Sequence, residues 1–202
     1  MEGRKAKIAV LVSGGGTNLQ ALIDAEKSGV LRSGRLALVI SNKADAYALV
    51  RAKNAGIETV VVKKTDRATF ESRITEELES RSIDLIVLAG FMVILSKEFT
   101  DRYPERILNV HPSLIPSFCG EGFYGLKVHE AALNRGVKVT GATVHFVNEI
   151  ADGGKIVMQK AVEVKEGDTP EILQRRVMEE AEWKILPASC EIVCKKIKEN
   201  IK

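Results

Sequence analysis

Hydrophobic positions in the first half of the chain alternate between short uninterrupted runs and stretches with helical spacing. Residues 7–12 (KIAVLV) form a continuous apolar run, and residues 18–27 then carry apolar side chains every three or four positions. Apolar strands separated by amphipathic helices are typical of a parallel sheet covered on both faces. The same reasoning predicts strands at 36–40, 58–62, 85–88 and 107–110, and helices at 47–55 and 68–81.

The pattern changes after residue 110. A glycine-rich stretch at 112–125 precedes a short predicted helix at 126–135. Two strand-like runs then follow each other directly, at 139–147 and 155–164, which predicts an antiparallel pair. We therefore expect an α/β fold with a mainly parallel sheet flanked by helices and antiparallel strands added in the C-terminal half.

A long helix is predicted to end the chain. Thr169 is suited to cap it and Pro170 to occupy its first position, while Pro187 is expected to kink or interrupt it. The chain shows no repeat and no low-complexity linker, and 202 residues suit one domain of ordinary size. We predict a single domain over residues 1–202.

Composition narrows the classes of protein. With 30 Lys and Arg against 27 Asp and Glu, the net charge is +3 and the signs are interspersed, which argues against a dedicated nucleic-acid surface. No apolar stretch approaches the roughly 20 residues that span a bilayer, so neither membrane nor secretion is expected. The three cysteines (Cys119, Cys190 and Cys194) lack the clustering of a zinc site. We expect buried thiols, no bound metal, and a reducing cytoplasm.

The first candidate for chemistry is the segment SGGGTN at 13–18, between the first strand and the first helix. Glycines there allow successive backbone N–H groups to face one anion at a helix N-terminus, although a plain tight turn would use glycine too. No GK[ST] follows, and Leu19 replaces the last glycine of a dinucleotide motif. Residues 41–43 (SNK) offer no acid for a ribose. The segment favours a phosphate monoester over a dinucleotide.

Two further places carry polar groups that suit catalysis. Asn109 and His111 lie at the carboxyl end of the fifth predicted strand, where open α/β sheets bind their ligands. The histidine could exchange protons near neutral pH, and the amide could donate to an oxyanion. Asp152 precedes two glycines and could pair with an imidazole and raise its pKa. Each alone could equally be a turn residue.

Taken in order, the motifs NVHPSLIP (109–116), VHFV (144–147) and DGG (152–154) resemble the 10-formyltetrahydrofolate-dependent transferases. Four more motifs resemble the branch of that family that acts on glycinamide ribonucleotide: SGGGTNL (13–19), SNKADA (41–46), LAGFMVIL (88–95) and GDTPEILQRRV (167–177). The resemblance covers nearly the whole chain. It implies a Rossmann-like sheet extended by antiparallel strands.

The resemblance implies a role for each matching residue. Asn109, His111 and Asp152 fall on the family's catalytic triad. The residues implied to bind the phosphorylated substrate are Gly16, Thr17 and Asn18 at the phosphate and Glu182 at the ribose. Those implied to bind folate are Met92, Val93, Ile94 and Leu95 at the pteridine, Arg67 at the benzoylglutamate end, and Asn109.

The chain departs from the family pattern in three places. Many relatives carry Arg where Val93 stands, so a side-chain contact there is lost. The helix is one residue longer between Val177 and Glu182, which weakens the match of that acid. The segment 116–126 is longer and richer in glycine than the family's compact loop, and we expect it to border the active site.

Two histidines lie outside the triad. His129 is predicted to be structural, and His145, which alternates with apolar residues on a strand, to be a buried, hydrogen-bonded neighbour of the site. Neither is expected to be a catalyst.

The implied activity is transfer of a formyl group from 10-formyltetrahydrofolate, the co-substrate, to the amine of 5′-phosphoribosylglycinamide in de novo purine (IMP) biosynthesis. No metal is needed, because the formyl group is already activated. The expected partners are these two small molecules, with no nucleic acid or membrane and with a monomer or weak homodimer as the assembly. A formyltetrahydrofolate hydrolase, a methionyl-tRNA formyltransferase and a non-catalytic phosphosugar-binding module are the alternatives; the first two would be expected to carry an additional domain.

Overall fold

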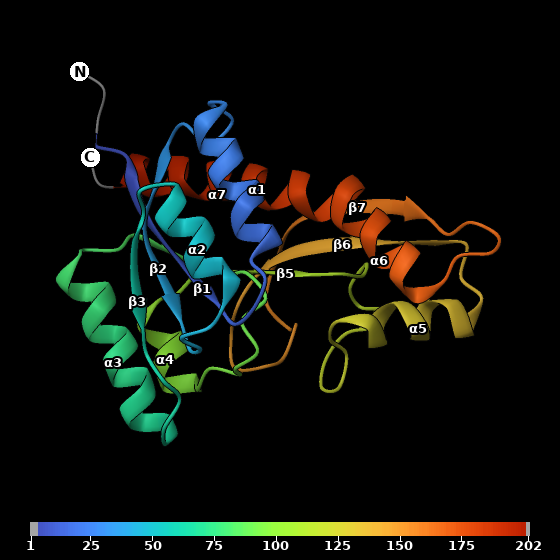
Figure 1. The fold of residues 1–202 in the computed structure, drawn as a ribbon, viewed down its shortest axis with the longest axis horizontal. Helices are drawn as coiled ribbons and strands as arrows, with labels where there is room; N and C mark the ends of the chain where they lie inside the picture. The colour runs from blue at the N-terminus through green and yellow to red at the C-terminus, as the bar shows by residue number, and fades with distance from the viewer. Residues whose placement is uncertain (1–3, 201–202) are drawn as a thin grey trace.

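The computed structural model describes residues 4–200, and within this range a seven-stranded sheet runs through the molecule in the order β3-β2-β1-β4-β5-β6-β7 (Figure 1). Strands β1 to β5 pair in parallel, whereas β5, β6 and β7 pair antiparallel. The predicted fold class is confirmed. The strands are β1 (Ala6–Val12), β2 (Gly34–Ser41), β3 (Glu58–Val61), β4 (Leu85–Leu88), β5 (Ile107–His111), β6 (Val139–Phe146) and β7 (Ile156–Glu163).

Helices cover both faces of the sheet. Helices α1, α2, α5, α6 and α7 contribute to one apolar core, and α3 and α4 to the other. Their bounds are α1 (Thr17–Lys27), α2 (Tyr47–Asn54), α3 (Arg67–Ser80), α4 (Lys97–Arg102), α5 (Leu126–Arg135), α6 (Pro170–Val177) and α7 (Trp183–Asn200), with a π-helix, η1, at Met178–Glu182.

Strand β1 shows why its sequence is apolar throughout. Successive side chains point to opposite faces of a sheet, so Ile8 and Val10 enter the first core while Ala9 and Leu11 enter the second. Because helices cover both faces, neither set of side chains reaches water, and all four residues are fully buried. A continuous apolar run is therefore the pattern that this position in the sheet requires.

Most element boundaries fall within two residues of the predictions, and α5 matches at both ends. The pattern missed α4, a short helix. Its start carried a usable signal, because Ser96 is the N-cap and its hydroxyl accepts from the N–H of Phe99 at 3.1 Å. Strand β5 also extends one residue further than predicted and includes His111.

The predicted terminal helix is divided into three parts. Thr169 caps α6 as expected, with Pro170 at its first position, and α6 leads into η1 and then α7. Of the two expectations for Pro187, a kink or an interruption, the interruption is wrong, because α7 continues through this residue. Pro187 is only the fifth residue of α7, so the backbone hydrogen bond that it removes belongs to the first turn after η1.

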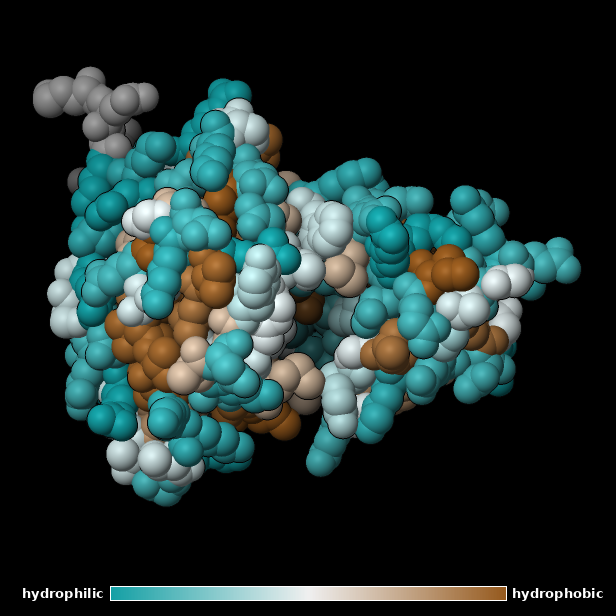
Figure 2. Space-filling model, in the orientation of Figure 1, coloured by the Kyte–Doolittle hydropathy of each residue, from teal (hydrophilic) through white to brown (hydrophobic). Residues whose placement is uncertain are grey.

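The parallel arrangement brings the carboxyl ends of β1, β4 and β5 to one edge of the sheet. Figure 2 shows the surface hollowed between the part of the molecule built on the parallel strands and the lobe that carries α5 and α6. The segments that follow β1 and β4, together with the end of β5, contain most of the predicted site residues, so this edge is where a site would be assembled.

Candidate active site

The glycine-rich segment after β1 is held by α2. Gly16 has φ +73° and is the N-cap of α1, and a Cβ added to it would lie 2.6 Å from Cβ of Ala48. The N–H of Ala48 donates to the carbonyl of Gly14 at 3.0 Å, and Nε of Arg51 donates to that of Gly15 at 2.9 Å. Only glycine fits at position 16, for a packing reason that the sequence did not reveal.

The two predicted binding segments are directly connected. The backbone N–H of Met92 donates to Oγ of Ser13 at 3.0 Å, which ties the segment after β4 to the glycine-rich segment. Met92 and Ile94 are 59% and 61% exposed, whereas Leu95 is buried. Exposed apolar side chains beside a hollow suit an apolar ligand.

Arg67 lies at the exposed start of α3. One turn later on the same face, Phe70 stacks on Phe91 with ring centroids 6.3 Å apart. The aromatic pair joins α3 to the segment 91–95, whereas no contact of Arg67 itself with that segment is recorded among the described residues.

Asn18 and Glu182 meet across the site although 164 positions separate them in the chain. Nδ2 of Asn18 donates to Oε2 of Glu182 at 2.7 Å, and Glu182 is only 6% exposed. Burial raises the pKa of the Glu182 carboxyl, and the hydrogen bond from Asn18 opposes this shift. Glu182 is the last residue of η1, so the extra residue noted in the sequence is absorbed by a π-turn that still directs the carboxylate to Asn18.

Asp152 lies between two imidazoles. Its Oδ2 is 3.3 Å from Nδ1 of His111, and its Oδ1 is 3.4 Å from Nε2 of His145. Nε2 of His145 also lies 3.2 Å from Nδ2 of Asn109. The structure therefore brings the three predicted triad residues into one connected group, with His145 joining Asn109 to Asp152.

His145 has a defined role in that group. Its Nδ1 lies 2.8 Å from the carbonyl oxygen of Phe146, which can only accept, so Nδ1 carries a proton. Nε2 accepts from the amide of Asn109 when the ring is neutral and donates to Oδ1 of Asp152 when the ring is protonated. The expectation of a buried, hydrogen-bonded residue holds, since His145 is 2% exposed.

The geometry agrees with both interpretations of Asp152, as a turn residue and as a carboxylate paired with an imidazole. Asp152 has φ +55°, and Gly153 donates its N–H to the carbonyl of Ile150 at 3.0 Å. A Cβ on Gly154 would lie 1.7 Å from the carbonyl oxygen of Phe146. The two glycines permit the tight turn, and the turn aims the carboxylate at the histidines.

The segment 116–126 contacts both members of the His–Asp pair. The carbonyl of Phe118 accepts from Nε2 of His111 at 2.8 Å, and the N–H of Gly120 donates to Oδ2 of Asp152 at 2.9 Å. Sequence reasoning placed this segment beside the site but assigned it no contact. Because both contacts use backbone atoms, side-chain identity gave no signal for them.

For both His111 and Asp152, burial shifts the pKa in one direction and the charge of the other residue shifts it in the opposite direction. Burial lowers the pKa of His111 and outweighs Asp152 and the Phe118 carbonyl, which raise it. For Asp152, burial raises the pKa, but the His145 hydrogen bond, the Gly120 N–H and the neighbouring imidazoles together lower it. The expectation that Asp152 raises the pKa of His111 is right for that single interaction, but the net shift is downward.

His129 is fully buried in α5, and neither ring nitrogen has a partner among the described residues. Burial lowers its pKa to about 4, with the nearby His111 acting in the same direction. A neutral ring at physiological pH agrees with the structural role predicted for it.

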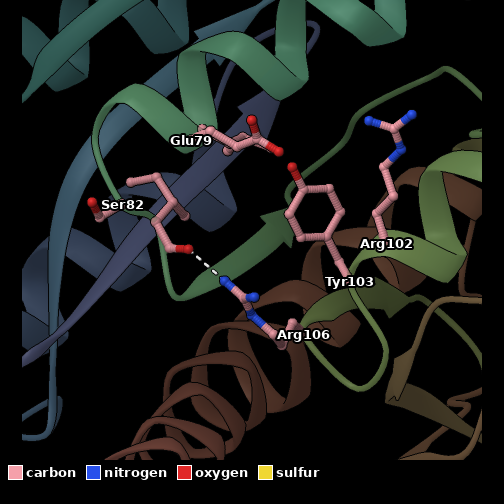
Figure 3. A pocket seen from close by; sticks show the side chains of 7 residues that line it. Glu79, Ser82, Arg102, Tyr103 and Arg106 are labelled. Carbon is pink, nitrogen blue, oxygen red and sulfur yellow. Dashed lines mark hydrogen bonds between the residues drawn. The ribbon is translucent and has the colours of Figure 1, made fainter.

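A separate cavity of about 560 Å³ lies beyond the ends of α3 and α4 (Figure 3). Nε and Nη2 of Arg106 donate to the carbonyls of Asp84 and Ile83, and its guanidinium lies over the ring of Tyr103. None of the predicted site residues lines it. Arg106 therefore stabilises the packing of the backbone at residues 83–84 against Tyr103.

The described residues contain no group of three or more His, Cys, Asp or Glu arranged to hold a metal ion. Among the same residues, no helix is long and apolar enough to cross a membrane.

The class of protein is defined by comparison with known families. The formyl transferase family matches residues 6–189, and the chain belongs to that family. It is 48% identical over 195 residues to the human trifunctional purine biosynthetic protein adenosine-3, a match that covers 95% of this chain and 19% of the human protein. The chain thus spans about a fifth of the length of the first such relatives.

Shorter relatives are matched over most of their length. The phosphoribosylglycinamide formyltransferase of Haemophilus influenzae is 47% identical over 184 residues, which is 90% of this chain and 84% of that protein. The crystal structure of glycinamide ribonucleotide transformylase 1 from Symbiobacterium toebii superposes with a TM-score of 0.89 at 42% identity, covering 96% of this chain and 90% of that one.

Proposed function

We propose that this protein is a phosphoribosylglycinamide formyltransferase, which transfers the formyl group of 10-formyltetrahydrofolate to the amine of glycinamide ribonucleotide in purine biosynthesis. The observation that carries the proposal is the connected group of Asn109, His111 and Asp152, which lies at the same sheet edge as the glycine-rich segment. Relatives of that name at 42% to 47% identity support it.

The binding residues divide between the two substrates. Gly16, Thr17 and Asn18 receive the phosphate at the N-terminus of α1, where backbone N–H groups face an anion. Glu182 receives the ribose hydroxyls. The segment Met92–Leu95 binds the pteridine of the folate and Arg67 its anionic end, and Ser13 fixes the distance between the two substrates.

Transfer requires a bond between the amine nitrogen and the formyl carbon and loss of the bond from that carbon to N10. Negative charge gathers on the formyl oxygen, to which Asn109 donates while His145 holds its amide. His111 stabilises the same oxygen and moves a proton from the amine to N10. Asp152 orients His111 and favours its charged form.

One rearrangement must precede this step. In this structure Nε2 of His111 is occupied by the Phe118 carbonyl and Nδ1 faces Asp152. Nε2 must therefore exchange the Phe118 carbonyl for substrate before it can act on the formyl group. The segment 116–126 yields that hydrogen bond when substrate binds.

The test is a spectroscopic assay of 10-formyltetrahydrofolate conversion with and without glycinamide ribonucleotide. Transfer predicts that loss of the donor depends on the ribonucleotide and that formylglycinamide ribonucleotide appears in equal amount. Release of formate without the ribonucleotide would favour a hydrolase, a possibility raised by the 28% identical formyltetrahydrofolate deformylase of Pseudomonas syringae, which superposes with a TM-score of 0.81. Binding without turnover would favour a phosphosugar-binding module.

The proposal extends to the setting of the protein. Residues 1–202 form one formyltransferase domain that acts in the cytoplasm, as a monomer or weak homodimer, without nucleic acid or membrane partners. The near balance of positive and negative residues, interspersed along the sequence, supports the absence of a nucleic-acid partner. Sedimentation of the purified chain at several concentrations tests the assembly.

A further inference from the structure

A second cavity, of about 630 Å³, lies between α1 and α7 on the outer side of the glycine-rich segment. We call it the α1–α7 slot. Its volume is in the range of small-molecule sites. Of the residues assigned to the proposed active site, only Thr17 lines it, so it is a separate feature of the surface. The residues used below are Ala21, Asp24, Ala25, Arg51, Trp183 and Lys184.

The walls of the slot suit a flat apolar group. Ala21 and Ala25 are one turn apart on α1, and their small side chains leave space between the helices. Trp183, the only tryptophan in the chain, provides the facing aromatic wall from α7. Its indole nitrogen has no acceptor among the described residues, so the ring lacks the hydrogen bond that usually fixes a buried indole.

The rim of the slot carries two cations, Arg51 and Lys184, and the guanidinium of Arg51 lies over the ring of Tyr47 at 5.0 Å. Arg51 uses Nε on the Gly15 carbonyl and Nη1 on Gln20, and no hydrogen bond of its Nη2 is recorded among the described residues. Lys184 is exposed, and no ion pair of its ammonium group is recorded among the described residues. Asp24 is the one acid of the lining, and it accepts from Gln20 at 2.9 Å. Two cations against one acid favour an anionic ligand.

We propose that the α1–α7 slot binds a planar heteroaromatic ring that carries a phosphate, of the size of a nucleoside monophosphate. The ring packs against Trp183 over Ala21 and Ala25, and the phosphate pairs with Arg51 and Lys184. The proposal does not depend on formyl transfer, although its test uses the proposed binding of glycinamide ribonucleotide to fill the phosphate site.

The slot also adjoins the substrate contacts. Trp183 directly follows Glu182, and Thr17 precedes Asn18, so a ligand in the slot touches the helices that hold the Asn18–Glu182 pair. Arg51 links the slot to the glycine-rich segment through its bond to Gly15.

The single tryptophan makes the test direct. The full chain is first saturated with glycinamide ribonucleotide, so that the proposed phosphate site at residues 16–18 is filled. It is then titrated with adenosine 5′-monophosphate while the fluorescence of Trp183 is recorded. Excitation is at a wavelength that the nucleotide does not absorb. Parallel titrations use adenosine, which lacks the phosphate, and ribose 5-phosphate, which lacks the ring. We expect a saturable change with the nucleotide, a weaker one with adenosine and none with ribose 5-phosphate.

Matched variants locate the binding. Lys184→Gln should weaken the nucleotide about 10-fold, and Ala25→Leu, which fills the slot, should abolish the response, while Lys138→Gln removes the same charge from an exposed position directly before β6 and should change nothing. The proposal is overturned if the nucleotide gives no saturable change, if ribose 5-phosphate gives the same response, or if Lys184→Gln and Lys138→Gln behave alike. Circular dichroism confirms that each variant is folded.

Discussion

The two halves of the molecule assemble their parts of the site in different ways. In the parallel half, the glycine-rich segment is a contiguous stretch that a neighbouring helix, α2, holds in place through Gly16 and Ala48. In the antiparallel half, Asp152 reaches His111 only because β6 and β7 carry its turn back beside β5. The candidate phosphate-binding segment is thus one stretch of sequence, whereas the candidate catalytic group is assembled by long-range pairing.

The difference predicts that substitutions in the antiparallel half and at the end of β5 affect chemistry, and that those in the parallel half affect binding and stability. Contacts within the glycine-rich segment help to stabilise the fold, so their loss should reduce both stability and ligand binding. A carboxylate or imidazole at the edge of the sheet contributes less to packing, so its substitution should have less effect on the fold.

The largest effect is expected for His111→Ala. General acid–base groups contribute about 10² to 10⁴ in rate, so kcat should fall at least 10²-fold while affinity for the ribonucleotide stays nearly unchanged. Steady-state kinetics with both substrates, together with calorimetric titration of the ribonucleotide, measure the two quantities. Turnover close to that of the unmodified protein would remove His111 from the mechanism.

Asp152→Asn should reduce kcat by about 10². Asn tolerates the left-handed backbone found at this position, so the turn and the melting temperature should be preserved. Loss of the carboxylate removes an interaction that raises the pKa of His111, so that pKa should fall further and the acidic limb of the pH–rate profile should move to lower pH.

The histidine titration distinguishes the two readings of Asp152. NMR of the His111 ring signals in both proteins reports the shift directly. An unchanged kcat together with an unshifted titration would leave Asp152 with its turn role alone.

Gly16→Val tests the parallel half. A side chain at φ +73° that also meets Ala48 should cost about 2 to 4 kcal/mol of stability and weaken binding of the ribonucleotide about 10-fold or more, with little change in folate affinity. Gly15→Ala is the matched control, because a Cβ there meets nothing within 4 Å.

Denaturant unfolding and calorimetric titration separate the two effects. Equal destabilisation by Gly16→Val and Gly15→Ala would contradict the packing argument. Lost folate binding with intact ribonucleotide binding would show that the two substrate sites are assigned the wrong way round.

The parallel and antiparallel halves also differ in how their elements could be predicted from the sequence. Apolar runs such as residues 7–12 predicted the parallel strands, because burial on both faces leaves a pattern that does not depend on distant residues. The antiparallel pair was predicted from its spacing. The short helix α4 was missed because its six residues are too few to show a hydrophobic period, and the π-turn of η1 because a hydrogen-bond offset within a helix leaves no clear mark on that period.

For the site, the motifs named the residues but not their contacts. Nothing in the sequence indicated that His145 lies within 3.4 Å of both Asn109 and Asp152, since this depends on the register of β5 against β6. The backbone contacts of Phe118 and Gly120 were equally invisible. Side-chain chemistry can be predicted from sequence, whereas the backbone groups that complete it must be seen in the structure.

The smallest effect is expected for Glu182→Gln, which changes the hydrogen bond between Asn18 in the first half of the chain and Glu182 in the second. Burial raises the pKa of Glu182 in the folded state above its unfolded value, so between these two values the folded chain binds one more proton than the unfolded chain. Stability contributed by this group is therefore present below the unfolded pKa and is lost as pH rises through the folded pKa. Glu182→Gln keeps the shape and can still accept from Asn18, but it does not titrate.

The melting temperature of Glu182→Gln, relative to the unmodified chain, should thus rise as pH increases from about 4.5 upward. Affinity for the ribonucleotide should fall only about 10-fold, because one charged acceptor of the ribose hydroxyls is replaced by a neutral one. Thermal melts of both proteins across this pH range measure the first effect and calorimetry the second. A constant difference in melting temperature at every pH would mean that Glu182 has the same pKa in the folded and unfolded chain, and the Asn18 hydrogen bond would then fully offset burial.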